Sequence, residues 1–184
     1  MIKRGVDVKG FNTAFAGDVP LGAGMSSSAA LESAYAYAIN DLFGENKIDK
    51  FELAKVGQAT EHNYIGVKCG IMDQFASVFG KEGSLMRLDC RSLEYQYFPF
   101  KPEGYRLVLV DSVVKHELAS SAYNKRRESC ENVVKAIAKK HEGVEFLRDC
   151  TLEMLAEVKA EVSEEDYMRA EYVIEEIQRV LDVC

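Results

Sequence analysis

Apolar residues recur at helical spacing directly after the Gly- and Ser-rich residues 22–28. Six of them share one face of a helix: Leu31, Ala34, Tyr35, Ala38, Ile39 and Leu42. Gly44 follows them, and glycine is common just past the end of a helix. The pattern therefore predicts an amphipathic helix that ends at Gly44, with these six residues as its apolar face.

A second helix is indicated by its capping residues. Asp49 can cap a helix with its carboxylate, and Glu52 stands at the third helical position, as in a capping box. We expect this helix to run to about Tyr64, because Gly66 lies just past that point and suits a helix end.

Three further helices are expected. A Gly-marked loop at residues 66–70 leads into a short helix within residues 71–80, and a long helix is expected over residues 119–140. The last helix opens at Ser163 and carries a regular apolar face up to the end of the chain. That face comprises Ala170, Val173, Ile174, Ile177 and Leu181.

Strand-like runs of β-branched and aromatic residues lie between the helices. Residues 11–19 and 105–110 predict single strands, the second of them buried, and residues 84–89 and 93–100 predict a hairpin around a three-residue turn. The sequence KPEG at residues 101–104 is the clearest candidate domain boundary. Helices and strands segregated in this way indicate the α+β class.

Composition is that of a globular protein, with 47% hydrophobic and 29% charged residues in 184. No apolar run approaches the roughly 18 residues of a membrane span, and the first ten residues lack the apolar core of a signal peptide. The net charge of −7 argues against a broad nucleic-acid-binding face. Five scattered cysteines without a CxxC pair favour reduced thiols in the cytoplasm.

The segment PLGAGMSSSAA, residues 20–30, has the character of a phosphate-binding loop. Glycines before a helix N-terminus let the backbone approach a phosphate, and the unpaired N–H groups there favour an anion. The loop residues are Gly22, Ala23, Gly24, Met25, Ser26, Ser27 and Ser28. The loop lacks the lysine of a Walker A motif and the spacings of GxGxxG and GxSxG. A plain Gly/Ser linker with a serine cap is the alternative.

Phosphoryl transfer also needs carboxylates, one to hold Mg²⁺ and one near the acceptor hydroxyl. Glu61, near the end of the second helix, and Asp73, after the loop at residues 66–70, can reach one site. Asp73 is set among apolar residues in GIMDQF, where burial without a purpose would be costly. We interpret His62 as a helix-packing or hydrogen-bonding residue. Tyr123 either packs in the core or points towards a ligand, and the basic run after it is expected to be solvated.

Together these motifs resemble the galactokinase family of GHMP small-molecule kinases. The resemblance rests on PLGAGMSSSAALE, ATEH, CGIMDQF and HELASSAYNKRRESC, in this order, and runs essentially from Phe11 onwards. It implies two α+β domains with the active site between them, the first like domain 2 of ribosomal protein S5. Residues 1–103 would form the second half of the N-terminal domain, and residues 104–184 the first part of the C-terminal domain.

The resemblance also implies a role for each motif. Residues 22–28 would bind the phosphates of ATP, and Ser28 and Glu61 would hold Mg²⁺. Asp73 would receive or orient the proton of the sugar's C1 hydroxyl, and Gly70 and Tyr123 would contact the sugar. The implied reaction converts ATP and α-D-galactose into ADP and α-D-galactose 1-phosphate, with no nucleic acid or membrane as partner.

Two family motifs are missing from this sequence. It has neither the early segment resembling GEHTDYN, with its upstream arginine, nor the late GGGFGG-type segment. We therefore expect a chain truncated at both ends that has no useful kinase activity by itself. Three alternatives stay open: a related kinase for N-acetylgalactosamine or arabinose, a non-catalytic sensor of sugar and ATP, and a remnant of a shortened gene.

Overall fold

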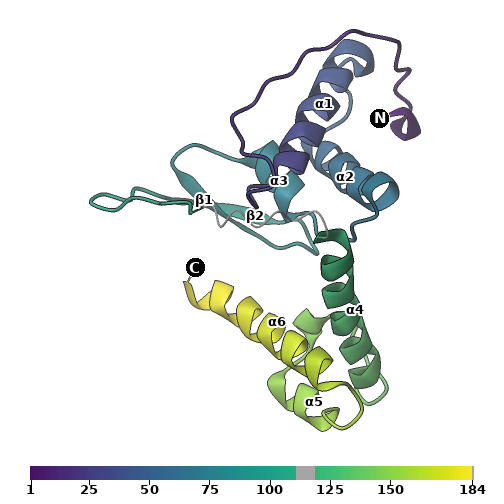
Figure 1. Ribbon diagram of the computed structural model, residues 1–184, viewed down its shortest axis with the longest axis vertical. Helices are drawn as coiled ribbons and strands as arrows, with labels where there is room; N and C mark the ends of the chain where they lie inside the picture. The colour runs from purple at the N-terminus through teal and green to yellow at the C-terminus, as the bar shows by residue number, and fades with distance from the viewer. Residues whose placement is uncertain (111–118, 184) are drawn as a thin grey trace. The chain divides into compact units, whose positions relative to one another are not determined.

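The computed structural model describes residues 1–110 and 119–183, and the chain divides into two compact units (Figure 1). The first is Met1–Glu117 and the second is Leu118–Cys184. The domain boundary expected at residues 101–104 lies before this division and stays a prediction. Of the helices among the described residues, none combines the length and apolar character that crossing a membrane requires.

Three helices form the body of the first unit, and all three agree with the sequence pattern: α1 (Ser27–Gly44), α2 (Lys50–Thr60) and α3 (Met72–Phe79). The carboxylate of Asp49 accepts a hydrogen bond from the backbone N–H of Glu52 at 2.9 Å, which confirms the predicted cap. After α2 the chain continues as a π-helical turn over Glu61–Ile65, and Gly66 ends it with a left-handed φ of 81°.

The face that α1 buries differs from the predicted one. Leu31 and Leu42 are exposed, and the residues that α1 buries are Ala29, Ser33, Ala36 and Asn40. Small side chains allow α1 to approach its neighbours closely. Asn40 is buried because its side chain binds both backbone groups of Ile48, donating to the carbonyl at 2.9 Å and accepting from the N–H at 3.2 Å.

The predicted hairpin is present as β1 (Ser84–Leu88) and β2 (Tyr95–Pro99), which pair antiparallel. One face of it covers an aromatic cluster. Phe75 and Phe79 of α3 stack with ring centroids 4.2 Å apart, and Phe51 of α2 and Tyr95 of β2 pack edge-on or tilted against them. Phe75 and Phe79 are buried and form the apolar core of the first unit with Ala54, Ile71 and Val78, whereas Phe51 and Tyr95 are more than a third exposed.

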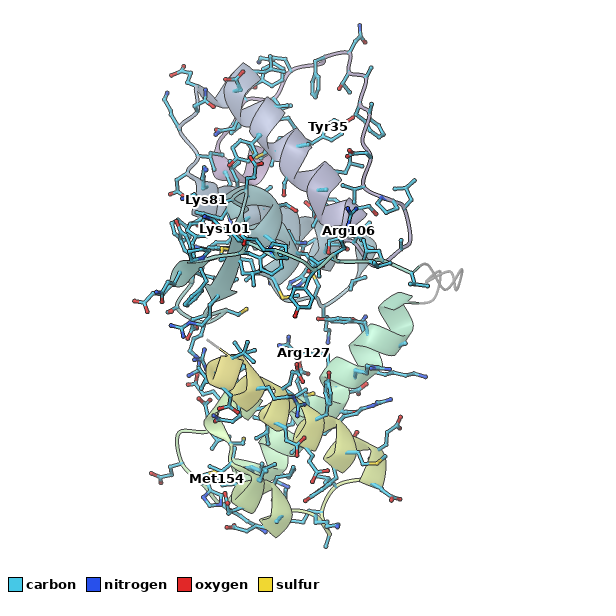
Figure 2. All side chains as sticks on the ribbon, turned by 90° about the vertical axis from the view of Figure 1, so that its left-hand side faces the viewer. Tyr35, Lys81, Lys101, Arg106, Arg127 and Met154 are labelled. Carbon is cyan, nitrogen blue, oxygen red and sulfur yellow. The ribbon has the colours of Figure 1, made fainter. Side chains whose placement is uncertain are left out.

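The two predicted single strands are wrong. Strands need a neighbour that satisfies their backbone groups, and within the described residues the hairpin is the whole of the sheet structure. Residues 11–19 instead lie along α1, where Phe11 contacts Phe43 and Phe15 contacts Tyr35, which is labelled in Figure 2. Residues 105–110 were expected to be buried, but their apolar side chains are between 73% and 86% exposed.

The second unit is a small helical bundle of α4 (Ala119–Ile137), α5 (Leu152–Glu157) and α6 (Glu164–Val183), with a 3-10 turn at Leu147–Asp149. Its core is built from Val133, Ile137, Leu155, Val158 and Ala170. Of the apolar face predicted for α6, Ala170 is buried and Val173 and Ile174 are half-buried, whereas Ile177 and Leu181 are exposed. The predicted helix over 119–140 ends at Ile137.

Candidate active site

Three residues of the loop before α1 have left-handed backbone. Gly22, Gly24 and Ser26 all adopt left-handed conformations, with φ of 71°, 73° and 56°. This conformation costs about 1–2 kcal/mol for a residue with a side chain, which explains the two glycines and makes Ser26 a strained position. Alternating backbone of this kind turns successive N–H groups towards one point, where they can bind an anion.

The N-terminus of α1 is also left open by its own side chains. Ser26 is the N-cap residue, but its hydroxyl makes no capping hydrogen bond. The first N–H groups of a helix have no acceptor within the helix, so those of α1 are available to an outside anion. Ser28 is exposed in this first turn, Met25 is exposed beside it, and Ala23 is half-buried in the loop.

Glu32 lies one turn after Ser28 on the same side of α1, and sequence reasoning missed it. Its side chain accepts a long hydrogen bond of 3.5 Å from the amide of Gln74 on α3. Burial raises the pKa of Glu32 to about 7, the negative charge of Glu61 adds to the rise, and the hydrogen bond from Gln74 opposes it. Glu61 therefore lies close enough to Glu32 for their charges to interact.

Glu61 is buried at the first position of the π-helical turn. The wider turn lets its carbonyl accept from two backbone N–H groups, those of Gly66 at 2.8 Å and Val67 at 3.1 Å. These two bonds fold the loop at residues 66–70 back against the end of α2. The carboxylate of Glu61 is thereby held at the place where helix and loop meet.

Asp73 is half-buried in the first turn of α3, and Asp73 and Glu61 both lie near Cys69. Burial raises the pKa of the Cys69 thiol, and the charges of Glu61 and Asp73 raise it further. Both carboxylates expected from the sequence are thus near one thiol. The Cys69 carbonyl accepts from Gln58 at 3.3 Å and from the His62 ring at 2.8 Å, which confirms the hydrogen-bonding role expected for His62.

The donor set fits a phosphate-bound Mg²⁺. Within residues 1–110 and 119–183 no three His, Cys, Asp or Glu side chains gather as a metal site. Mg²⁺ commonly takes only one or two protein oxygens and fills the remaining positions with phosphate and water. The Ser28 hydroxyl and the Glu61 carboxylate are oxygen donors of this kind, and the left-handed loop suits the phosphates.

The two residues expected to contact the sugar, Gly70 and Tyr123, are both exposed. Gly70 is exposed in its loop, and a side chain there would meet no other atom within 4 Å. Tyr123 lies exposed on α4 of the second unit, and residues 116–118 of its motif are outside the described residues. Arg127, labelled in Figure 2, pairs with Glu131 at 2.8 Å on the surface, as expected for a solvated helix face.

Comparison with known proteins gives a consistent result. Residues 1–81 match the sequence model described as GHMP kinases N terminal domain. A galactokinase of Thermotoga maritima is 48% identical over 97% of this chain and 48% of that protein. A galactokinase of Clostridium tetani is 38% identical over 98% of this chain and 46% of that protein. The chain thus spans about half the length of the curated relatives it matches.

A solved structure extends the likeness to the fold. The crystal structure of Lactococcus lactis galactokinase complexed with galactose matches with a TM-score of 0.72 and 28% identity. The match covers 89% of this chain and 42% of the Lactococcus chain. The predicted α+β class is confirmed by this match together with the helices and hairpin described above.

Proposed function

We propose that this chain is part of a GHMP kinase and that the whole protein containing it is a galactokinase. The reaction would transfer the γ-phosphoryl group of ATP to the C1 hydroxyl of α-D-galactose, giving ADP and galactose 1-phosphate. Mg²⁺ would accompany the nucleotide. The similarity to galactokinases over 97% of the chain supports this substrate in preference to N-acetylgalactosamine or arabinose.

One observation carries the proposal. A loop with left-handed residues at Gly22, Gly24 and Ser26 opens α1, and both expected carboxylates lie in the same unit, near Cys69. Phosphoryl transfer depends mainly on positioning and charge neutralisation. A site that combines a phosphate cradle, an oxygen pair for a cation and a separate half-buried carboxylate supplies the required parts.

The roles follow from the chemistry of each side chain. The N–H groups of residues 22–28 would bind the ATP phosphates, and Ser28 and Glu61 would hold Mg²⁺. When bound, Mg²⁺ would neutralise charge that develops on the transferred group. Asp73 would orient the sugar's C1 hydroxyl and accept its proton, while Gly70 and Tyr123 would contact the sugar.

The arrangement of domains and the cellular location are further parts of the proposal. We assign residues 1–103 to the N-terminal domain and residues 104–184 to the C-terminal domain, with the sugar bound by residues of both. A cytoplasmic location is supported by the odd number and wide spacing of the cysteines.

A phosphorylation assay on a panel of sugars tests the function. The whole protein is supplied with ATP, Mg²⁺ and either galactose, N-acetylgalactosamine, arabinose or glucose, and ADP release and sugar phosphate are both measured. We expect galactose to give the highest kcat/KM. Preference for another of these sugars would move the assignment to a related kinase, and binding of sugar and ATP without turnover would indicate a sensor.

A further inference from the structure

Three helices of the first unit meet at a polar contact that the proposed reaction does not use directly. Glu32 of α1 and Gln74 of α3 are joined there by their hydrogen bond of 3.5 Å. Gly57 of α2 lies against both, since a Cβ atom at Gly57 would come within 3.5 Å of the Glu32 carboxylate and 2.8 Å of the Gln74 Cγ. We call Glu32, Gly57 and Gln74 the helix junction.

Gln74 is an unusual residue for this position. Its side chain is only 2% exposed, next to the aromatic cluster, and its carbonyl oxygen has no hydrogen-bond partner among the described residues. Burying an amide with an unsatisfied oxygen costs free energy that an apolar side chain of the same size would avoid. Gln74 also acts against the raised pKa of the Cys69 thiol, so it lies near the loop before α3 as well as α1.

Each junction residue has a fixed relation to one residue of the proposed site. Ser28 precedes Glu32 by one turn on the same side of α1, and Glu61 follows Gly57 by four residues. Asp73 is the direct neighbour of Gln74 in the first turn of α3. A shift of one helix against another at the junction would therefore change the distances between the phosphate loop, the cation ligand and Asp73.

We propose that Glu32 and Gln74 are positioning residues that hold the phosphate loop and Asp73 in the relative positions needed for phosphoryl transfer. The proposal rests on the proposed function. Neither side chain touches the reacting atoms: they act through α1 and α3. Misplacement of reacting groups by about 1 Å can lower a rate by about 10²-fold, so a modest movement at the junction is sufficient for a large effect.

Four variants of the whole protein test this role. Gln74→Met keeps the side-chain volume and removes the amide, and Glu32→Ala removes the carboxyl. Both should lower kcat by about 10- to 100-fold with little change in the KM for ATP. Glu32→Gln keeps an acceptor oxygen for Gln74 and should retain kcat within about threefold. Ser33→Ala is the control, because it alters a buried neighbour of Glu32 whose hydroxyl has no hydrogen-bond partner among the described residues.

Two further readouts separate positioning from mere stability. The kcat of the double variant Glu32→Ala, Gln74→Met should be no more than about threefold below that of the less active single variant, because both changes break the same contact. In the nucleotide-free protein, hydrogen exchange of the α3 amides from Phe75 onwards, which have acceptors one turn before them, should be faster in Gln74→Met and Glu32→Ala than in Glu32→Gln.

The outcomes distinguish this proposal from the function on which it rests. If the unaltered protein phosphorylates no sugar, the proposed function fails, and the positioning role falls with it. If the unaltered protein is active and Gln74→Met and Glu32→Ala keep its kcat, the positioning role alone is wrong. The positioning role is also wrong if the fold-losses in kcat of the two single variants multiply in the double variant, because Glu32 and Gln74 would then act independently.

Discussion

Gly57 is the point at which the packing of α1, α2 and α3 can be tested by adding one carbon atom. It lies inside α2, has no left-handed φ, and is therefore free to become alanine as far as the backbone is concerned. The added Cβ would come 2.8 Å from the Gln74 Cγ, closer than Cβ atoms in proteins approach other carbons. Relief of this clash requires a shift of the Gln74 side chain, which would disturb its hydrogen bond to Glu32.

Two opposing contributions set the expected size of the effect. Alanine is favoured over glycine inside a helix by about 1 kcal/mol. Overpacking a tight core costs about 1–3 kcal/mol. The structure predicts that the clash is the larger of the two, so Gly57→Ala should lower the free energy of unfolding by about 1 kcal/mol.

The Gln74→Ala background provides a matched control. There the Cγ atom is absent, and the remaining neighbours, the Cβ at position 74 and the Glu32 carboxylate, are both 3.5 Å away, an ordinary contact distance. Gly57→Ala should then raise stability by about 0.5–1 kcal/mol through helix propensity alone. Urea unfolding followed by circular dichroism measures the free energy of unfolding with glycine and with alanine at position 57, in the parent and in the Gln74→Ala background. Hydrogen exchange of the α2 and α3 amides reports on the first unit alone. The same sign of effect in both backgrounds would refute the packing described at the junction.

Three further predictions concern stability. Asp49→Ala removes the cap on the Glu52 N–H and should cost about 1 kcal/mol in urea unfolding, whereas Asp49→Asn should cost less; equal losses would contradict the capping role. Phe75→Ala empties the centre of the aromatic cluster and should cost about 3–5 kcal/mol, and a loss below about 1 kcal/mol would mean that Phe75 is not buried as described. The pKa of Glu32 is raised to about 7 in the folded protein, so the folded state holds this proton more tightly than the unfolded chain does. The resulting stabilisation is complete at a pH below the ordinary pKa of a glutamate and is lost as the pH rises through about 7. Stability of the parent should therefore fall relative to Glu32→Gln between about pH 5 and pH 8, and parallel pH curves would show that the group does not titrate in this way.

Helix positions were predictable because their signals are local. The cap at Asp49 and the glycine at position 66 each act within a few residues, and the helices begin and end where these residues stand. The face that α1 buries was not predictable from apolar spacing. Spacing reports which side chains are apolar, whereas close contact with α2 and α3 selected small residues such as Ala36 and the polar Asn40.

The two missed strands have a related cause. The composition of residues 11–19 and 105–110 suits a strand, but a strand also needs a partner whose backbone groups are available. Among the described residues no such partner pairs with either segment. Sequence pattern identifies the preference of a segment, and the neighbours determine whether the preference is realised.

The candidate site was predicted in part for similar reasons. Gly22 and Gly24 are residues that favour left-handed conformations, so the backbone of this loop could be expected from the sequence. Glu61 and Asp73 could be selected from 30 acidic residues through the family resemblance and the apolar setting of Asp73. Gln74 had no comparable signal, because its importance depends on contacts with α1 and with the loop before α3.

Replacement of Asp73 by asparagine tests the central claim most directly. Asparagine keeps the size of the side chain but cannot accept the proton of the sugar's C1 hydroxyl. In the whole protein, supplied with ATP, Mg²⁺ and galactose, Asp73→Asn should lower kcat for galactose 1-phosphate formation by about 10²-fold or more while ATP affinity is kept. The exposed Asp7→Asn is the matched control and should retain the parent rate. Formation of galactose 1-phosphate by Asp73→Asn at the parent rate would contradict the assignment of this site.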